Sequence, residues 1–165
     1  MKKRTCAILA AHTGKCAKGV GKALEHLLRL MVEEGFDEFI CGMERGLEQL
    51  AAETILTLRE TMAIRLCGLV DSEEQWLSWS LGERDVLFSI MQRADYEYRV
   101  ANAGVENLQR EKLRYVSVEA DRLLLLCSVL SGRYALLARE MRLRGKEVFL
   151  LDPVSLRTTR YLELL

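Results

Sequence analysis

The 165-residue sequence has no excess of charge of either sign and no apolar run long enough to cross a membrane. Lysine and arginine together number 24, as do aspartate and glutamate. Because these charges balance, the protein has no net positive charge that would attract nucleic acid or an anionic membrane. The apolar runs fall short of the roughly 20 residues of a membrane span, and the run after Arg4 is too short for a signal peptide. We therefore expect a cytoplasmic protein with no membrane partner, and the charge balance disfavours nucleic acid.

Clusters of metal ligands are also lacking. The two histidines, His12 and His26, lack the spacing of a zinc site, and the five cysteines include no CxxC pair. Cys16 lies in a polar loop, whereas the other four cysteines lie in or at the end of apolar runs, where a thiol behaves as a small hydrophobe. We expect reduced cysteines, no metal and no cofactor.

Apolar runs alternate with segments of helical periodicity, which predicts an α/β fold. The order indicates a Rossmann-like, doubly wound and mainly parallel sheet with helices on both faces. The length suits one domain, residues 1–165, with a core over about 5–153 and a tail over 154–165. Ser72 is predicted to cap a helix, with Gln75 completing a capping box. Strands are expected over 5–11, 36–41, 62–70, 94–100, 121–126 and 147–151, and helices over 20–34, 46–60, 83–93, 105–118 and from Arg133 to Arg144.

Three glycine-containing loops follow predicted strands. They are Thr13-Gly14-Lys15, the segment from Gly42 through Glu44 to Gly46, and Ser131-Gly132-Arg133. Ligands of open α/β sheets lie beyond the carboxyl ends of the strands, and the first N–H groups of a following helix favour an anion. With the hydroxyls of Thr13 and Ser131 and the cations of Lys15 and Arg133, this pattern predicts a phosphate-binding edge. The alternative is that the glycines only permit sharp turns.

Two carboxylates accompany the second loop. Glu44 and Glu48 are four residues apart and could bind ribose hydroxyls or act as acid and base. The alternative is that they complement the dipole of a helix start. Glu48 is the candidate catalytic residue. Neither common nucleotide motif is present, because Val20 and Gly21 replace the lysine and hydroxyl of a Walker A loop, and Leu24 replaces the third glycine of the dinucleotide fingerprint.

Two further patterns favour structural roles. Trp76 and Trp79, at helical spacing, predict core or interface contacts rather than base stacking. Arginines recur over residues 110–144 but alternate with glutamates, which predicts a solvated face of mixed charge.

In this order along the chain, these residues resemble the YpsA-like proteins of the SLOG superfamily, which also contains the DprA proteins and the LOG-type phosphoribohydrolases. The resemblance implies a bacterial protein with a Rossmann-like sheet and a pocket for a nucleotide or a nucleotide-derived ligand. The residues that carry it are Thr13-Gly14, Gly42 to Glu48, Ala51-Ala52-Glu53, Gln75-Trp76, Trp79, Ala94-Asp95, Ala120-Asp121, Ser131-Gly132 and Asp152-Pro153.

The chain departs from the family pattern in four places. Lys15-Cys16 replaces a His-Arg pair, Lys112-Leu113 stands at an Arg-Asn pair, Arg133 stands in a Gly-Gly-Thr turn, and Glu48 replaces an aspartate. The Pro-Gly-Gly-x-Gly-Thr-x-x-Glu stretch of the phosphoribohydrolases is absent, which argues against their reaction.

Three functions stay open. The first is a sensor or regulatory domain that binds a nucleotide-like small molecule, with no established catalysis. The second is a hydrolase of an N-glycosidic or phosphate bond that uses Glu48. The third is a protein-interaction module with a vestigial pocket, and a homo-oligomer stays open with it.

Overall fold

The computed structural model describes residues 3–12, 14–100 and 108–162. They form a seven-stranded sheet in the order β4-β3-β2-β1-β5-β6-β7, parallel except for β7. The predicted Rossmann-like α/β fold is therefore confirmed. The strands are β1 (Thr5–Ala10), β2 (Glu38–Gly42), β3 (Arg65–Val70), β4 (Tyr96–Arg99), β5 (Arg122–Leu126), β6 (Glu147–Leu151) and β7 (Thr158–Arg160), and the helices are α1 (Val20–Glu33), α2 (Leu47–Arg59), α3 (Leu81–Arg93), α4 (Leu108–Glu119) and α5 (Gly132–Leu143).

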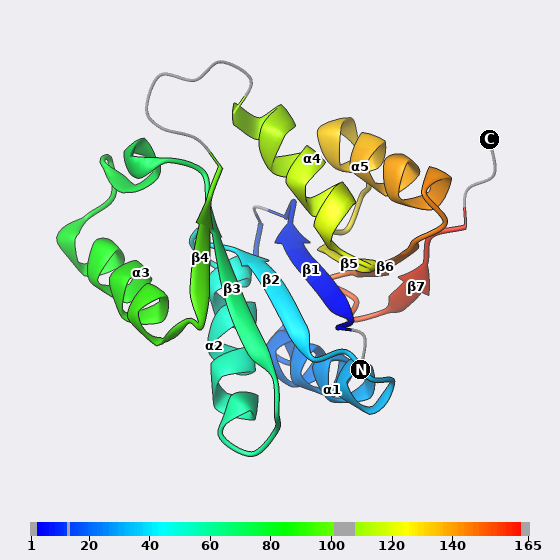
Figure 1. The fold of residues 1–165 in the computed structure, drawn as a ribbon, viewed down its shortest axis with the longest axis horizontal. Helices are drawn as coiled ribbons and strands as arrows, with labels where there is room; N and C mark the ends of the chain where they lie inside the picture. The colour runs from blue at the N-terminus through cyan, green and yellow to red at the C-terminus, as the bar shows by residue number, and fades with distance from the viewer. Residues whose placement is uncertain (1–2, 13, 101–107, 163–165) are drawn as a thin grey trace.

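The helices cover both faces of the sheet, with α4 and α5 side by side over one of them (Figure 1). Alternate residues of β1 supply the two cores. Cys6 and Ile8 pack with the helices α1, α2 and α3, whereas Ala7 and Leu9 pack with α4 and α5. Strands buried on both faces need apolar residues at every position, which explains the continuous runs in the sequence. The strand order reverses beside β1, where the chain crosses from one face to the other.

The segment after β3 differs from its prediction. Ser72 caps the short 3₁₀ helix η1 (Glu73–Trp76), its Oγ accepting from the backbone N–H of Glu74 at 3.2 Å. The Oε1 of Gln75 accepts from the N–H of Asp71 at 3.0 Å rather than from Ser72. The predicted capping box at Ser72 is therefore wrong.

A capping box does form at the start of α3. The Oγ of Ser80 accepts from the N–H of Glu83 at 3.2 Å, and the Oε1 of Glu83 accepts from the N–H of Ser80 at 2.9 Å. Because Ser80-x-x-Glu83 satisfies both exposed donors, α3 begins at Leu81, two residues before its predicted start.

The tail contains a strand that the prediction omitted. Residues Thr158–Arg160 pair antiparallel with β6 as the edge strand β7. Tyr161 packs against the core beneath α5, whereas Leu162 is exposed. The predicted helix start at residue 105 lies outside the described residues. Among those described, no helix is long and apolar enough to cross a membrane.

Candidate functional site

A cavity of about 720 Å³ opens at the carboxyl edge of the sheet. Its walls come from the end of β1 and the loop after it, from the β2–α2 loop with the start of α2, and from the start of α5. These are the three segments that contain the glycine loops of the sequence. The fold thus brings together residues that are more than a hundred positions apart.

Five of the ten predicted site residues line this cavity: Gly14, Glu44, Gly46, Glu48 and Arg133. The other described ones are not in its lining: Lys15, Gly42, Ser131 and Gly132. Thr13 lies outside the described residues. Gly42 still has a defined place, because an ideal Cβ there would lie 2.1 Å from Oε1 of Glu48.

The carboxylate of Glu48 joins two walls of the cavity. This side chain, 2% exposed, lies in the first turn of α2. Its Oε2 accepts from the backbone N–H of Ala10, at the end of β1, and its Oε1 accepts from the N–H of Glu44, both at 3.0 Å. Gly42 makes room for the carboxylate, since any side chain at that position would displace it. Glu48 therefore fixes the two loops relative to each other while one edge of it faces the cavity.

Burial raises the pKa of Glu48, and the charge of Lys112 together with the two backbone donors opposes this rise. Lys112 projects from α4 and is buried, with its Nζ 3.0 Å from Oδ1 of Asp71. Burial lowers the pKa of Lys112, but the carboxylates of Glu48 and Asp71 outweigh it, so the pKa is raised. The three groups form a buried charge cluster beneath the site.

Asp71 has further partners besides Lys112. Its Oδ2 accepts from Nε2 of Gln109 at 3.0 Å, and its N–H is bound by Gln75. The residues of this cluster were not among the predicted site residues apart from Glu48. Lys112 had stood out only as a departure from the family pattern, because no local pattern signals a contact between residues 71 and 112.

Two arginines line the cavity, one from the β2–α2 loop and one from the start of α5. Arg45 packs its guanidinium over the ring of Trp79, 4.8 Å from the ring centre, and its Nη1 lies 3.1 Å from Oε2 of Glu83. Arg133 lies over the ring of Tyr134 at 5.3 Å. Arg45 and Tyr134 line the cavity but were not predicted, because nothing in the sequence places α3 beside the second loop.

Two helix starts also face this edge. Gly46, with φ of 93°, and Ser131 are the N-cap residues of α2 and α5, and neither forms a side-chain capping bond. Uncapped N–H groups at a helix start favour an anion. The cavity lining combines the cations Arg45 and Arg133 with the carboxylates of Glu44 and Glu48. Arg45 is paired with Glu44 as well as with Glu83, since its Nε lies 3.6 Å from Oε1 of Glu44.

Cys16 is exposed at the rim, whereas the other four cysteines are buried and free. Burial raises the pKa of Cys6 to about 12 and that of Cys67 to about 11. In the described part of the chain, no group of three or more histidine, cysteine, aspartate or glutamate residues could hold a metal ion.

The family model YpsA, described as the YspA SLOG family, matches residues 9–128, which is more than half of the chain. The chain belongs to this family. The predicted resemblance to YpsA-like proteins is therefore confirmed. The match includes Glu48, Asp71 and Lys112 but ends before the start of α5, so Arg133 lies outside it.

Curated relatives of this YspA SLOG chain are bacterial proteins. The UPF0398 protein BH1768 of Halalkalibacterium halodurans is 27% identical over 119 residues, covering 70% of this chain and 63% of that protein. The UPF0398 protein RBAM_020340 of Bacillus velezensis is 29% identical over 110 residues, covering 65% of this chain and 60% of that protein. The chain thus spans less than two thirds of the length of the curated relatives that it matches.

Solved structures share the fold. DNA processing protein A from Streptococcus pneumoniae superposes with a TM-score of 0.66 at 11% identity, covering 91% of this chain and 50% of that one. The Helicobacter pylori protein, described as binding single-stranded DNA, has a TM-score of 0.61 at 16% identity, with 90% and 65% covered. The molybdenum cofactor carrier protein of Chlamydomonas reinhardtii has a TM-score of 0.53 at 11% identity, with 90% and 76% covered. The fold therefore does not exclude nucleic acid, and the expectation from net charge is not supported.

Proposed function

We propose that this YspA SLOG protein binds a nucleotide or a nucleotide derivative in the cavity at the carboxyl edge of the sheet, as a sensor or regulatory domain. The observation that carries the proposal is the polarity of the cavity. Arg45, Arg133 and the uncapped start of α2 line the cavity, and the Glu48 carboxylate lines it as well.

This polarity suits a molecule with an anionic end and a hydroxylated end. Phosphate oxygens at the mouth would accept hydrogen bonds from the helix N–H groups and the guanidinium groups. Glu48 uses one lone pair of each oxygen for a backbone N–H, and each oxygen retains another that can accept from a ribose hydroxyl. The volume of about 720 Å³ lies within the range of small-molecule sites.

The hydrolase alternative draws its support from the raised pKa of Glu48, since a buried carboxylic acid suits general acid catalysis. Both oxygens of Glu48 accept from backbone N–H groups of two different loops, however, which gives the carboxylate a structural role that accounts for its burial. We therefore place binding without turnover first. Catalysis that persists in Glu48→Gln would remove this residue from the mechanism.

Isothermal titration calorimetry of the purified protein with AMP, ADP, ADP-ribose and a nucleotide sugar tests the proposal. We expect one of these to bind, and Arg133→Ala and Arg45→Ala each to weaken its affinity about tenfold, equivalent to about 1.4 kcal/mol. Arg157→Ala, an exposed arginine outside the cavity lining, is the matched control and should bind as the wild type does. Absence of binding at millimolar concentrations of all four ligands would refute the proposal.

Single-stranded DNA belongs in the same series, because the Helicobacter pylori neighbour is described as binding it. A short oligonucleotide whose affinity falls steeply with salt and is lost in Arg133→Ala would make nucleic acid, rather than a free nucleotide, the ligand of this edge.

A further inference from the structure

A second concave surface lies on the outer side of α4 and α5, away from the sheet. We call it the α4–α5 groove; it has a volume of about 1130 Å³, and its residues come from both helices. Each helix has 12 residues, so at 1.5 Å per residue the groove follows them for about 18 Å. That length matches about three turns of a further helix laid along it.

The groove has apolar side chains that solvent reaches. Leu136 and Leu143 of α5 are 68% and 60% exposed, and Leu113 of α4 and Leu137 of α5 complete the apolar lining. Leu136 and Leu143 are seven positions apart, which places them two turns apart on one side of α5. Such a leucine strip between two helices suits the apolar face of an amphipathic helix.

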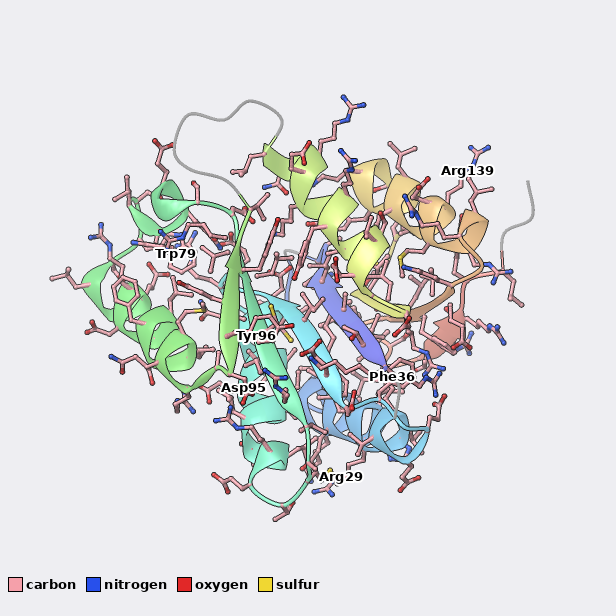
Figure 2. All side chains as sticks on the ribbon, in the orientation of Figure 1. Arg29, Phe36, Trp79, Asp95, Tyr96 and Arg139 are labelled. Carbon is pink, nitrogen blue, oxygen red and sulfur yellow. The ribbon has the colours of Figure 1, made fainter. Side chains whose placement is uncertain are left out.

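Positive charge dominates the rims. Five arginines and two glutamates line the groove. Arg144 pairs with Glu140 at 2.9 Å. Arg110, Arg114 and Arg139, in contrast, form no ion pair with any residue that the structure describes. Figure 2 shows Arg139 projecting from α5 away from the sheet. The alternation of charge in the sequence predicted a solvated face of mixed charge, and arginines and glutamates do share this groove. Among the described residues, however, three of these arginines have no carboxylate partner.

We propose that the α4–α5 groove binds an acidic amphipathic helix of a partner protein, with leucine-type side chains on the groove floor and carboxylates against the arginines. The arginine excess favours a negatively charged occupant, since guanidinium groups pair bidentately with carboxylates. Single-stranded nucleic acid fits less well, because no aromatic side chain of a described residue lines the groove, and base stacking needs such platforms. Pairing of this groove with the same groove of a second copy would bring like charges together.

The test uses fluorescence anisotropy with the full chain and a labelled synthetic peptide of about 15 residues, with leucines spaced at i, i+3, i+4 and i+7 and glutamates elsewhere. A second peptide carries lysine in place of each glutamate, and a third probe is a single-stranded oligonucleotide. We expect the acidic peptide to bind, to lose affinity as salt rises, and to bind at least about tenfold more tightly than the lysine peptide.

Two variants remove one component each. Arg114→Glu reverses a rim charge, and Leu136→Glu places a carboxylate on the apolar strip; each should weaken peptide binding about tenfold or more. The matched controls are Arg157→Glu and Leu81→Glu, which change exposed residues outside the groove and should leave it unchanged. Since Leu136 and Arg114 are exposed, unchanged thermal unfolding should confirm that the variants fold.

Three results would overturn the proposal. The first is the absence of peptide binding, or equal binding of the lysine peptide. The second is oligonucleotide binding that Arg114→Glu abolishes, which would assign the groove to nucleic acid. The third is self-association in light scattering that Leu136→Glu abolishes, which would assign the groove to a second copy of the chain.

Discussion

The contact between Gly42 and Glu48 leads to a prediction that concerns the candidate site and the stability of the fold together. Replacing Gly42 with alanine adds a methyl group that would lie 2.1 Å from Oε1, 2.5 Å from Cδ and 2.8 Å from Oε2 of Glu48. Ordinary contact begins at 3.4 Å, so the carboxylate must move by more than one ångström. It cannot do so without breaking a hydrogen bond, because its oxygens hold the N–H groups of Ala10 and Glu44.

The expected loss of stability follows from these contacts. Overpacking a buried position costs about 1–3 kcal/mol, and losing one hydrogen bond to a charged acceptor costs about 1.5–3 kcal/mol. Alanine returns about 0.4–1 kcal/mol by restricting the unfolded chain. We therefore expect Gly42→Ala to lower the free energy of unfolding by about 3 kcal/mol, together with a weaker affinity of the cavity for its ligand.

Urea unfolding followed by circular dichroism measures this difference. Gly21→Ala is the matched control, since Gly21 lies in α1 and nothing lies within 4 Å of an added Cβ; it should stabilise the protein by about 0.5–1 kcal/mol. In a Glu48→Ala background, Gly42→Ala should cost little, because the carboxylate that it meets is gone. Two results would refute the conclusion that Glu48 fixes the two loops relative to each other. One is a Gly42→Ala protein as stable as the wild type, and the other is an equal loss of stability from Gly42→Ala with and without the Glu48 side chain.

Three further predictions concern buried groups and the rim. Burial raises the pKa of Glu48 above its ordinary 4.5, so between pH 4.5 and the folded pKa the folded protein holds a proton that the unfolded chain has released. The stability of the wild type relative to Glu48→Gln should therefore fall as pH rises through this window. Urea midpoints of both proteins at a series of pH values measure this change. Lys112→Met leaves the buried Asp71 carboxylate without its cationic partner and should lower the free energy of unfolding, measured in urea, by about 3–5 kcal/mol. Adding Asp71→Leu to this variant should restore a large part of the loss. Iodoacetamide at pH 8 should label Cys16 alone among the five cysteines of the native protein, since the other four are buried. Mass spectrometry should find this labelling slower when a ligand fills the cavity. Labelling of Cys6, whose pKa burial raises to about 12, would contradict the burial of that thiol.

The sequence predicted the sheet well because its central strands are buried on both faces. The run over residues 123–126 has no polar face, as expected for a strand of a sheet covered on both sides. The edge strand β7 escaped prediction for the opposite reason. Its residues Thr158–Arg160 are all exposed, so neither apolar content nor alternation marks them, and only the pairing with β6 makes them a strand.

The candidate site was predictable to the extent that it depends on loops at strand ends. Glycine, a short strand and a following helix are local features, and they located Gly14, Gly46 and Arg133 at the cavity. The contacts that the side chains make in the site could not be predicted, because they depend on residues far away in the sequence. Arg45 is held by Trp79 and Glu83, which belong to a segment whose position beside α2 depends on packing across the whole face. Such long-range contacts produce no recognisable local pattern in the sequence.

The departure of the chain at Glu48 has a structural explanation that bears on its function. Glu48 lies one position after the first residue of α2, and its carboxylate reaches across to the N–H of Ala10 on the neighbouring strand while it also holds Glu44. An aspartate is one methylene shorter, so from the same Cα it could not span both donors without bringing α2 closer to β1. The longer side chain thus sets the distance between two walls of the cavity, and Lys112, placed beneath by α4, offsets part of the cost of its burial. Under the proposed function, changes at Gly42, Glu48 or Lys112 should therefore alter stability and ligand binding together.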